Sequence, residues 1–198
     1  MWCAAGRRYG LDPDPLVAAR GGVATVLAPA EVGRALADVL AGLAAAEEGE
    51  VWPDGGVALV PPGGALLPDL TVLDNLALGL TARSAADRRA RVEVAARLLQ
   101  VDGALDWHPD RLSAPQQLRA GMARALAAEP GLVVVEDRTG APPCGPVVAA
   151  AADRVAVLVV TDDLSRVRPV LDRQWTAVEL GPHRHRHRHR HRRTGGGG

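Results

Sequence analysis

Residues 111–140 read RLSAPQQLRAGMARALAAEPGLVVVEDRTG, and this stretch decides the fold. Ser113 is a residue type favoured at helix N-caps, and the spacing that follows predicts a helix through Leu126. Residues 132–135 then form a short run of Leu and Val, which is typical of a strand buried on both faces. A helix that leads into such a strand indicates an α/β protein with a parallel sheet.

The same alternation of apolar strands and helices continues on both sides of this stretch. Three further apolar runs have the composition of buried strands: residues 23–27, 57–60 and 155–160. Helical spacing is found in residues 31–46, 71–80 and 85–100, with Ser84 as the expected N-cap of the last segment. Strands that alternate with helices favour a largely parallel sheet covered by helices on both faces.

Composition limits both the core and the chemistry. The chain has 198 residues, enough for one α/β core, and 47% of them are hydrophobic while only 3% are aromatic. The core must therefore be built from Ala, Val and Leu. The sequence contains no lysine, so chemistry that depends on a lysine beside a phosphate is not available.

Charge is distributed unevenly along the chain. Residues 182–198 contain six arginines and no acid, whereas residues 1–181 contain 17 arginines and 23 acidic residues, a net charge of −6. An acidic body argues against nucleic acid as a partner of the folded part. Cys3 and Cys144 lie far apart without C-x-x-C spacing, and we expect two reduced thiols.

The sequence gives no sign of a signal peptide or a membrane span. Residues 1–8 lack the apolar stretch of a signal peptide, and no window of about 18 residues is uninterrupted by charge. We expect a soluble, cytoplasmic protein.

Four segments together resemble the ATP-binding subunits of ABC transporters. They are LLPDLTVLDN at 66–75, RLSAPQQLR at 111–119, MARALAAEP at 122–130 and LVVVEDRTG at 132–140. Their order and spacing are similar to the segment after the Q-loop, the signature L-S-G-G-Q, the A-R-A-L-x-x-x-P stretch and the Walker B strand with D-E-P-T-G. Any one of them would be weak, but together they cover about seventy residues. The details look most like the lipoprotein-releasing and macrolide-export branch.

The resemblance implies an architecture and a set of partners. It implies a P-loop NTPase-like α/β core from residues 1–71 and 116–181, a helical signature subdomain at 72–115 and a disordered tail at 182–198. ATP and Mg²⁺ are the implied ligands. A second ATPase subunit and a transmembrane permease are the implied partners, at the inner face of the cell membrane.

The expected phosphate loop is altered. A P-loop uses glycines to bring backbone N–H groups onto phosphates, a lysine, and a Ser or Thr for magnesium. Here residues 28–35 read APAEVGRA, so that Gly33 is the last glycine and Arg34 replaces lysine, while a register shifted by one residue also lacks Lys-Ser. Glu31 places a negative charge where phosphates would lie. Two interpretations remain: an ordinary strand–turn–helix connection, or weak nucleotide binding through Gly33 and Arg34. Tyr9 is similar to the adenine-stacking aromatic of the family.

The signature is altered as well. The resemblance implies that Ser113 contacts the γ-phosphate held by the opposing subunit and that Gln116 is the signature glutamine. Ala114 and Pro115 replace the two glycines, and proline has no N–H to donate. We favour a helix N-cap role for Ser113.

The acids after the Walker B strand are reversed. The family has Asp for magnesium followed by Glu for the attacking water, and this chain has Glu136 followed by Asp137. Glu136 is the candidate Mg²⁺ ligand and Asp137 the candidate catalytic base, although each differs by one methylene and phosphoryl transfer depends on positioning. Pro62 replaces the magnesium-contacting Gln. Asp162 replaces the switch His, where a carboxylate would repel a γ-phosphate.

Three hypotheses for function follow. The first is a degenerate, non-hydrolysing or weakly active ABC ATPase-like subunit that docks through residues 62–75 and 71–113; a decaying gene would have the same sequence features. The second is a weak ATPase that relies on Tyr9, Arg34, Glu136 and Asp137. The third is an adaptor acting through the His/Arg tail, whose imidazoles suit Ni, Cu or Zn and whose arginines suit RNA or anionic lipid, unless the tail is only a solvated repeat.

Overall fold

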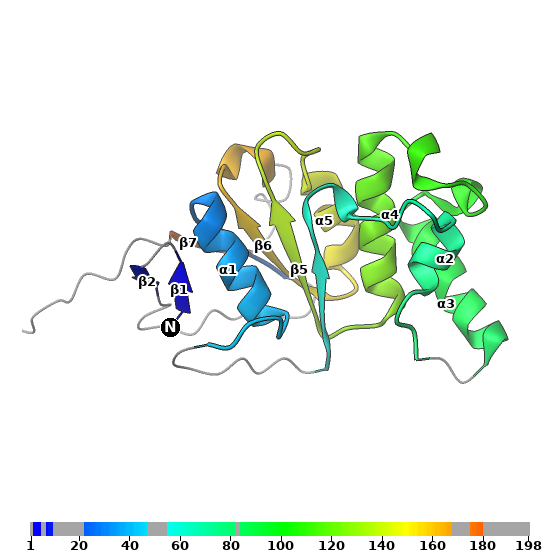
Figure 1. Ribbon diagram of the computed structural model, residues 1–198, viewed down its shortest axis with the longest axis horizontal. Coiled ribbons are helices and arrows are strands. Elements are labelled where there is room, and N and C mark those ends of the chain that lie inside the picture. Colours follow the sequence, from blue (N-terminus) through cyan, green and yellow to red (C-terminus); the bar gives the residue numbers. More distant parts are fainter. Residues whose placement is uncertain are drawn as a thin grey trace, which may run out of the picture.

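A parallel sheet of five strands forms the centre of the molecule (Figure 1). The structure is a computed structural model that describes residues 2–4, 7–9, 22–46, 55–81, 84–167 and 175–179. The strand order is β4 (Val57–Val60), β5 (Leu132–Asp137), β6 (Ala156–Thr161), β3 (Val23–Leu27) and β7 (Trp175–Glu179), and every neighbouring pair is parallel. A separate antiparallel pair is formed by β1 (Trp2–Ala4) and β2 (Arg7–Tyr9).

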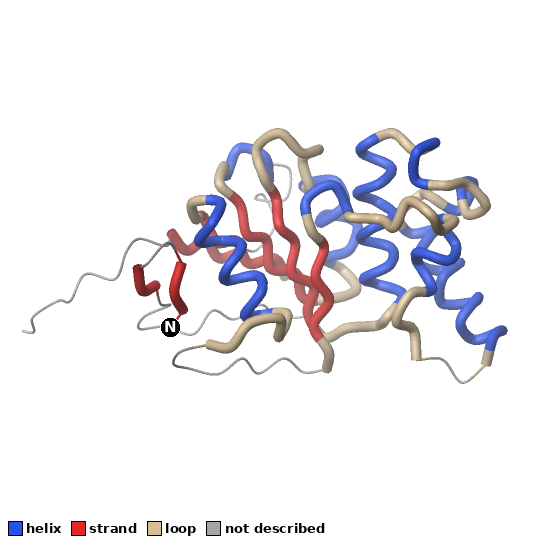
Figure 2. Tube along the Cα trace, viewed as in Figure 1, coloured by secondary structure: helices blue, strands red, loops and turns tan. Residues whose placement is uncertain are grey.

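Helices cover both faces of the sheet (Figure 2). Helix α1 (Ala30–Leu40) packs on one face, and α4 (Ala114–Ala127) and α5 (Gly145–Ala152) pack on the other. Helices α2 (Val72–Ala77) and α3 (Ala85–Leu98) lie beyond α4, at the right in Figure 1. Four short 3₁₀ helices complete the described elements: η1 (Pro62–Gly64), η2 (Asp102–Ala104), η3 (Pro109–Arg111) and η4 (Leu164–Val167).

The two faces of the sheet belong to two separate apolar clusters. Val133 and Val135 of β5 pack with α4 and α5, whereas Val134 packs with α1. Strand β6 alternates in the same way. All these residues are buried because successive side chains of a strand point to opposite faces, and both faces are covered.

The predicted fold class is confirmed. The four predicted strands are present, and β3 and β4 have the predicted bounds. Ser84 and Ser113 are N-caps of α3 and α4 as expected. The helix predicted for residues 31–46 was too long: α1 ends at Leu40, where Gly42 adopts φ +74° and the chain turns away. Helix α5 and strands β1, β2 and β7 were not anticipated.

Two expectations keep the status of predictions. The subdomain boundaries at residues 72 and 115 are one, although α2, α3, η2 and η3 do lie in this range. The disordered tail at 182–198 is the other, because it lies outside the described residues. Within the described part of the chain, no helix is both long enough and apolar enough to cross a membrane.

A close approach of two backbones fixes η1 against α4. Gly64 and Gly121 face each other, and a Cβ built on Gly121 would lie 2.6 Å from the carbonyl oxygen of Gly64 and closer still to its Cα. The guanidinium of Arg124 then donates to the carbonyls of Gly64 (2.9 Å) and Ala65 (3.0 Å). The segment that follows β4 is thereby held on the helix that leads to β5.

This contact yields a test. We expect Gly121→Ala to lower the free energy of unfolding by about 2–3 kcal/mol. The added methyl group would clash with backbone atoms of Gly64, and no side-chain rotamer change can relieve a clash with backbone. Helix propensity alone predicts the opposite, a gain of about 1 kcal/mol. Gly103→Ala is the matched control, since nothing lies within 4 Å of its added Cβ. Equal stabilities of the two variants in urea would contradict the contact.

Candidate functional site

The sequence-predicted site residues of the core gather where β3, β5 and β6 end. This is the edge of a parallel sheet at which α/β proteins bind ligands. Glu136 and Asp137 end β5, Thr161 ends β6 and is followed by Asp162, and β3 leads into α1. The helix start and the carboxylates therefore lie at the same edge of the sheet.

The connection from β3 to α1 is very short. Only Ala28 and Pro29 separate the strand from the helix, and the N–H of Ala28 donates to the carbonyl of Thr161 (2.9 Å). Pro29 has no N–H, and Gly33 already donates to the carbonyl of Pro29 (2.9 Å) as a regular helical residue. The chain thus makes an ordinary strand–turn–helix connection in place of a loop that encircles a phosphate.

Gly33 has a different part in the structure from the one the resemblance implies. A Cβ built on it would lie 2.9 and 3.2 Å from the two terminal nitrogens of Arg138, and 2.7 Å from a methyl group of Val160. Because Gly33 has no side chain, the Arg138 guanidinium can lie against the backbone of α1 at this position.

Glu136 is almost wholly buried and is flanked by two arginines. Its side chain is 1% exposed, and Arg138 Nη2 donates to Oε2 at 3.2 Å. Arg34 Nε lies 3.6 Å from Oε1, an ion-pair distance, while it donates a hydrogen bond to Asp38 at 3.1 Å. Burial raises the pKa of Glu136, and the nearby charges of Arg34 and Arg138 oppose this shift. The carboxylate that the resemblance assigns to magnesium is thus paired with guanidinium groups.

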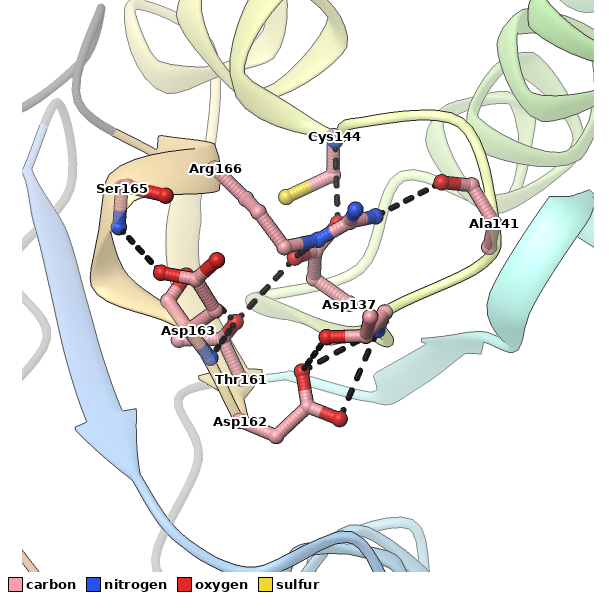
Figure 3. Close-up of polar contacts among 9 residues, drawn as sticks. Asp137, Ala141, Cys144, Thr161, Asp162, Asp163, Ser165 and Arg166 are labelled. Atoms are coloured by element: carbon pink, nitrogen blue, oxygen red, sulfur yellow. Dashed lines mark hydrogen bonds and ion pairs between the residues drawn. The ribbon is translucent and has the colours of Figure 1, made fainter.

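Asp137 points to the other face of the sheet and is also paired (Figure 3). Its side chain is 1% exposed, and Arg166 of η4 binds both oxygens, with Nε at 2.6 Å from Oδ2 and Nη2 at 3.2 Å from Oδ1. The N–H of Cys144 and the hydroxyl of Thr161 each donate to the carboxylate at 3.1 Å. Four donors therefore surround the group that would have to activate water.

Asp137 also changes the pKa values of two groups that contact it. The hydrogen bond that Arg166 donates to Asp137 is the largest cause of the raised pKa of Arg166. Burial raises the pKa of the Cys144 thiol, with the Asp137 charge acting in the same direction. Arg166 Nη2 additionally donates to the carbonyl of Ala141 (2.7 Å). The loop after β5 is thereby tied to η4.

Asp162 is engaged within the chain as well. Its Oδ1 accepts hydrogen bonds from the N–H of Thr139 (3.1 Å) and from the Thr139 hydroxyl (3.0 Å). The carboxylate at the switch position therefore bridges the loops after β5 and β6, as Figure 3 shows.

The signature residues lie apart from this group, at the start of α4. The N–H and the hydroxyl of Ser113 both donate to Oε1 of Gln116, at 2.8 and 2.9 Å. Ser113 and Gln116 thus cap their own helix, with Pro115 in its first turn. Pro62 opens η1. The backbone of Tyr9 lies in β2, and the position of its ring is outside what the structure describes.

The two arginines that pair with the candidate acids were not predicted from the sequence. Arg138 could have been found, because residues 136 and 138 share one face at the end of a strand. It stands where the family pattern D-E-P-T-G has proline. Arg166 could not, because its contact with Asp137 depends on how η4 folds back over the sheet edge.

Magnesium and triphosphate do not fit the residues present. The cation position beside Glu136 is filled by Arg138, the β3–α1 connection is too short for a phosphate loop, and Pro62 offers no side-chain oxygen. Within the described ranges, no group of three or more His, Cys, Asp or Glu side chains is arranged to hold a metal ion. We derive no catalytic step through such a group.

Comparisons with known proteins identify the relatives of this chain. The sn-glycerol-3-phosphate import ATP-binding protein UgpC of Salmonella paratyphi A is 32% identical over 146 residues, and that of Escherichia coli K12 is 31% identical. Each match covers 67% of this chain but only 41% of the relative. No family model matches the chain.

Solved structures show the same fold. The dimeric cassette MJ0796 in a post-hydrolysis state with ADP and Pi has a TM-score of 0.62 at 24% identity, over 77% of this chain and 80% of that one. CbiO1 of Clostridium perfringens, part of the transporter complex cbiONQ, has a TM-score of 0.64 at 19% identity, over 75% and 70%. The chain has the fold of an ABC-transporter ATP-binding domain, and its sequence is similar to such domains.

Removal of the partner of Asp137 gives a direct test of the buried ion pair. We expect Arg166→Met to lower the free energy of unfolding by about 3 kcal/mol, because it leaves an uncompensated buried carboxylate. Asp137→Asn in the same chain should recover part of this loss, and the coupling is measured by a double-mutant cycle in urea. Arg89→Met is the control, since its pair with Glu93 is exposed and worth no more than about 0.5 kcal/mol. Additive effects of the 137 and 166 changes would refute the pair.

Proposed function

We propose that the chain is a non-hydrolysing, ATP-binding-cassette-like subunit that serves as a structural partner in a membrane transport complex. The observation that carries this proposal is the state of Asp137, which is buried and bound by Arg166, Thr161 and the N–H of Cys144. A catalytic carboxylate must present a free oxygen to the attacking water. Freeing Asp137 from a buried ion pair would cost about 3–5 kcal/mol, a factor of at least ~10² in population.

The connection between β3 and α1 supports the same conclusion. With Ala28 N–H already bonded and Pro29 without a donor, only the first turn of α1 offers free N–H groups, and Glu31 lies in that turn. A carboxylate at a helix N-terminus competes with a bound anion for the same dipole and donors. Weak binding of triphosphate is therefore the most that this end of the sheet supports.

A partner surface lies on the side of η1 and α2. Leu67 is 48% exposed and Leu78 is 40% exposed, at the two ends of a segment that Asn75 holds in shape by hydrogen bonds to Leu67 and Leu70. Apolar side chains presented on a rigid loop are suited to docking. We propose that residues 62–75 and parts of 71–113 dock a permease subunit at the inner face of the membrane. A second, hydrolysing ATPase subunit is the other proposed partner.

The relatives support a transport role at the level of the ATP-binding domain. The chain spans less than half the length of the UgpC relatives, so their activity and substrate are not transferred to it. The similarity of residues 66–71 and 139–140 to the lipoprotein-releasing and macrolide-export branch stays a prediction, as does the reading of the site as degenerate.

The absence of hydrolysis can be measured directly. At millimolar Mg-ATP we expect the purified chain and its Asp137→Ala variant to release phosphate at the same background rate, because Asp137 has no free oxygen for water. The variant controls for contaminating ATPases. Turnover by the wild type that disappears in Asp137→Ala would overturn the proposal and establish the weakly active ATPase.

The partner surface is tested by charge insertion. We expect Leu67→Asp to reduce at least tenfold the recovery of a multi-span permease with the tagged chain from detergent-solubilised membranes, since a carboxylate buried at an apolar contact is costly. Leu43→Asp is the matched control, because Leu43 is 69% exposed in the turn that follows α1. Equal recovery with both variants, or recovery of no permease by the wild type, would contradict this surface.

A further inference from the structure

We propose that a cavity between α3 and the end of α4 binds a free medium-chain fatty acid, with the carboxylate on Arg154 and the alkyl chain on an apolar wall. In the part of the chain that the structure describes, the cavity is lined from residues 90–98, 126–130 and 154–155. We call it the α3–α4 cavity.

The α3–α4 cavity lies at the amino edge of the sheet. Residues 126–130 lead into β5, and residues 154–155 come directly before β6. Glu136 and Asp137 lie at the opposite, carboxyl edge of the sheet, where β5 ends. The cavity is therefore separate from the candidate functional site, and this inference does not depend on the proposed function.

The size of the cavity suits a small molecule. Its volume is about 620 Å³, within the range of about 300–1,000 Å³ in which small ligands bind. Leu98 of α3 and Leu126 of α4 contribute to its wall, and α3 packs against α4 (Figure 1). Such a volume accepts an alkyl chain.

Helix α3 has apolar side chains on two sides. One side, which includes Val92 and Leu99, is buried in the core. The other side is a stripe at i, i+4 and i+8 spacing that lines the cavity, and it consists of Ala90, Val94 and Leu98. Val94 is 56% exposed, so folding of the chain leaves this stripe uncovered. An apolar ligand would remove the stripe from water.

The charges around the cavity leave one cation for a ligand. Arg91 lies between two acids, with Nε 3.4 Å from Oδ1 of Asp87 and Nη1 3.2 Å from Oε2 of Glu129. Arg154 is exposed, and among the described residues its guanidinium has no ion pair or hydrogen bond. The lining thus combines a neutralised arginine with one that has no counter-charge.

This combination selects the chemical class of the ligand. A guanidinium binds a carboxylate through two parallel N–H···O bonds. The apolar stripe beside Arg154 gives no partner to the further charges of a polyanion, and a neutral alkane would leave the guanidinium unused. A single carboxylate with an alkyl chain satisfies both parts of the lining.

Octanoate is the probe in the experiment, with the full chain. We expect binding with a Kd of ~10⁻³ M or tighter, ordinary for a ligand of about ten non-hydrogen atoms. Butyrate carries the same charge and should bind at least about tenfold more weakly, because it buries fewer methylenes. Calorimetry measures the affinities. Amide NMR locates the site: signals of Val94, Leu126 and Val155 should shift, and those of Glu136 and Asp137 should not.

Three exposed positions supply the variants. Arg154→Met should weaken octanoate binding about tenfold and leave 1-octanol binding unchanged, since only the carboxylate contact is lost. Val94→Asn should weaken the binding of both compounds. Arg88→Met is the matched control, because it removes the same charge from an exposed position of α3 that does not line the cavity.

The proposal is wrong if octanoate does not bind, if butyrate binds as tightly, or if Arg88→Met weakens binding as much as Arg154→Met. Shifts confined to signals outside the α3–α4 cavity would overturn it as well. Binding to phosphatidylglycerol vesicles without binding of octanoate would indicate a membrane surface as the partner, and this too would contradict a free fatty acid.

Discussion

Two adjacent carboxylates are buried at the end of the central strand β5, and the surrounding structure must neutralise both. Glu136 and Asp137 are each 1% exposed, and because they are neighbours in a strand they point to opposite faces of the sheet. A buried carboxylate without a partner costs several kcal/mol. Each face therefore needs its own cation, Arg138 with Arg34 on the α1 side and Arg166 on the α5 side.

This requirement organises the loops at the carboxyl edge. Arg166 binds Asp137 and the carbonyl of Ala141, and Asp162 accepts two hydrogen bonds from Thr139, so that the segments after β5 and β6 are joined twice. On the opposite face Arg138 lies across Gly33 and holds β5 close to the start of α1. In an ATP-binding cassette this edge has to remain open to nucleotide. Here Asp137, Asp162 and one oxygen of Glu136 accept hydrogen bonds from other groups of the chain.

The sequence was sufficient for the sheet and only partly sufficient for the site. Residues 23–27 and 57–60 were predicted as strands with their observed bounds. A short apolar run rich in β-branched residues and bounded by Gly and Pro is typical of a buried strand. Helix α5 was missed: its eight residues are nearly all apolar and show no periodicity that separates a helix from a strand. The positions of Glu136 and Asp137 followed from the motif order. Their partners did not, since Arg166 is 29 residues away from Asp137 and meets it only through the tertiary fold.

The pairing of both acids bears on how the proposed non-hydrolysing subunit would stay folded without nucleotide. In an enzyme that binds Mg-nucleotide, the bound ligand partly neutralises the acids at this edge. The free-energy cost of burying their charges is then offset only while the ligand is bound. In this chain Arg138 and Arg166 pair with the two acids in the absence of any ligand. The two ion pairs therefore offset the cost of burying the carboxylates as part of the free energy of folding. Without these two arginines, the fold would have two buried carboxylates lacking their ion-pair partners at its centre. With the two arginines, the sheet and its covering helices can be stable in the absence of nucleotide, which is the physical condition that the proposed non-hydrolysing subunit requires.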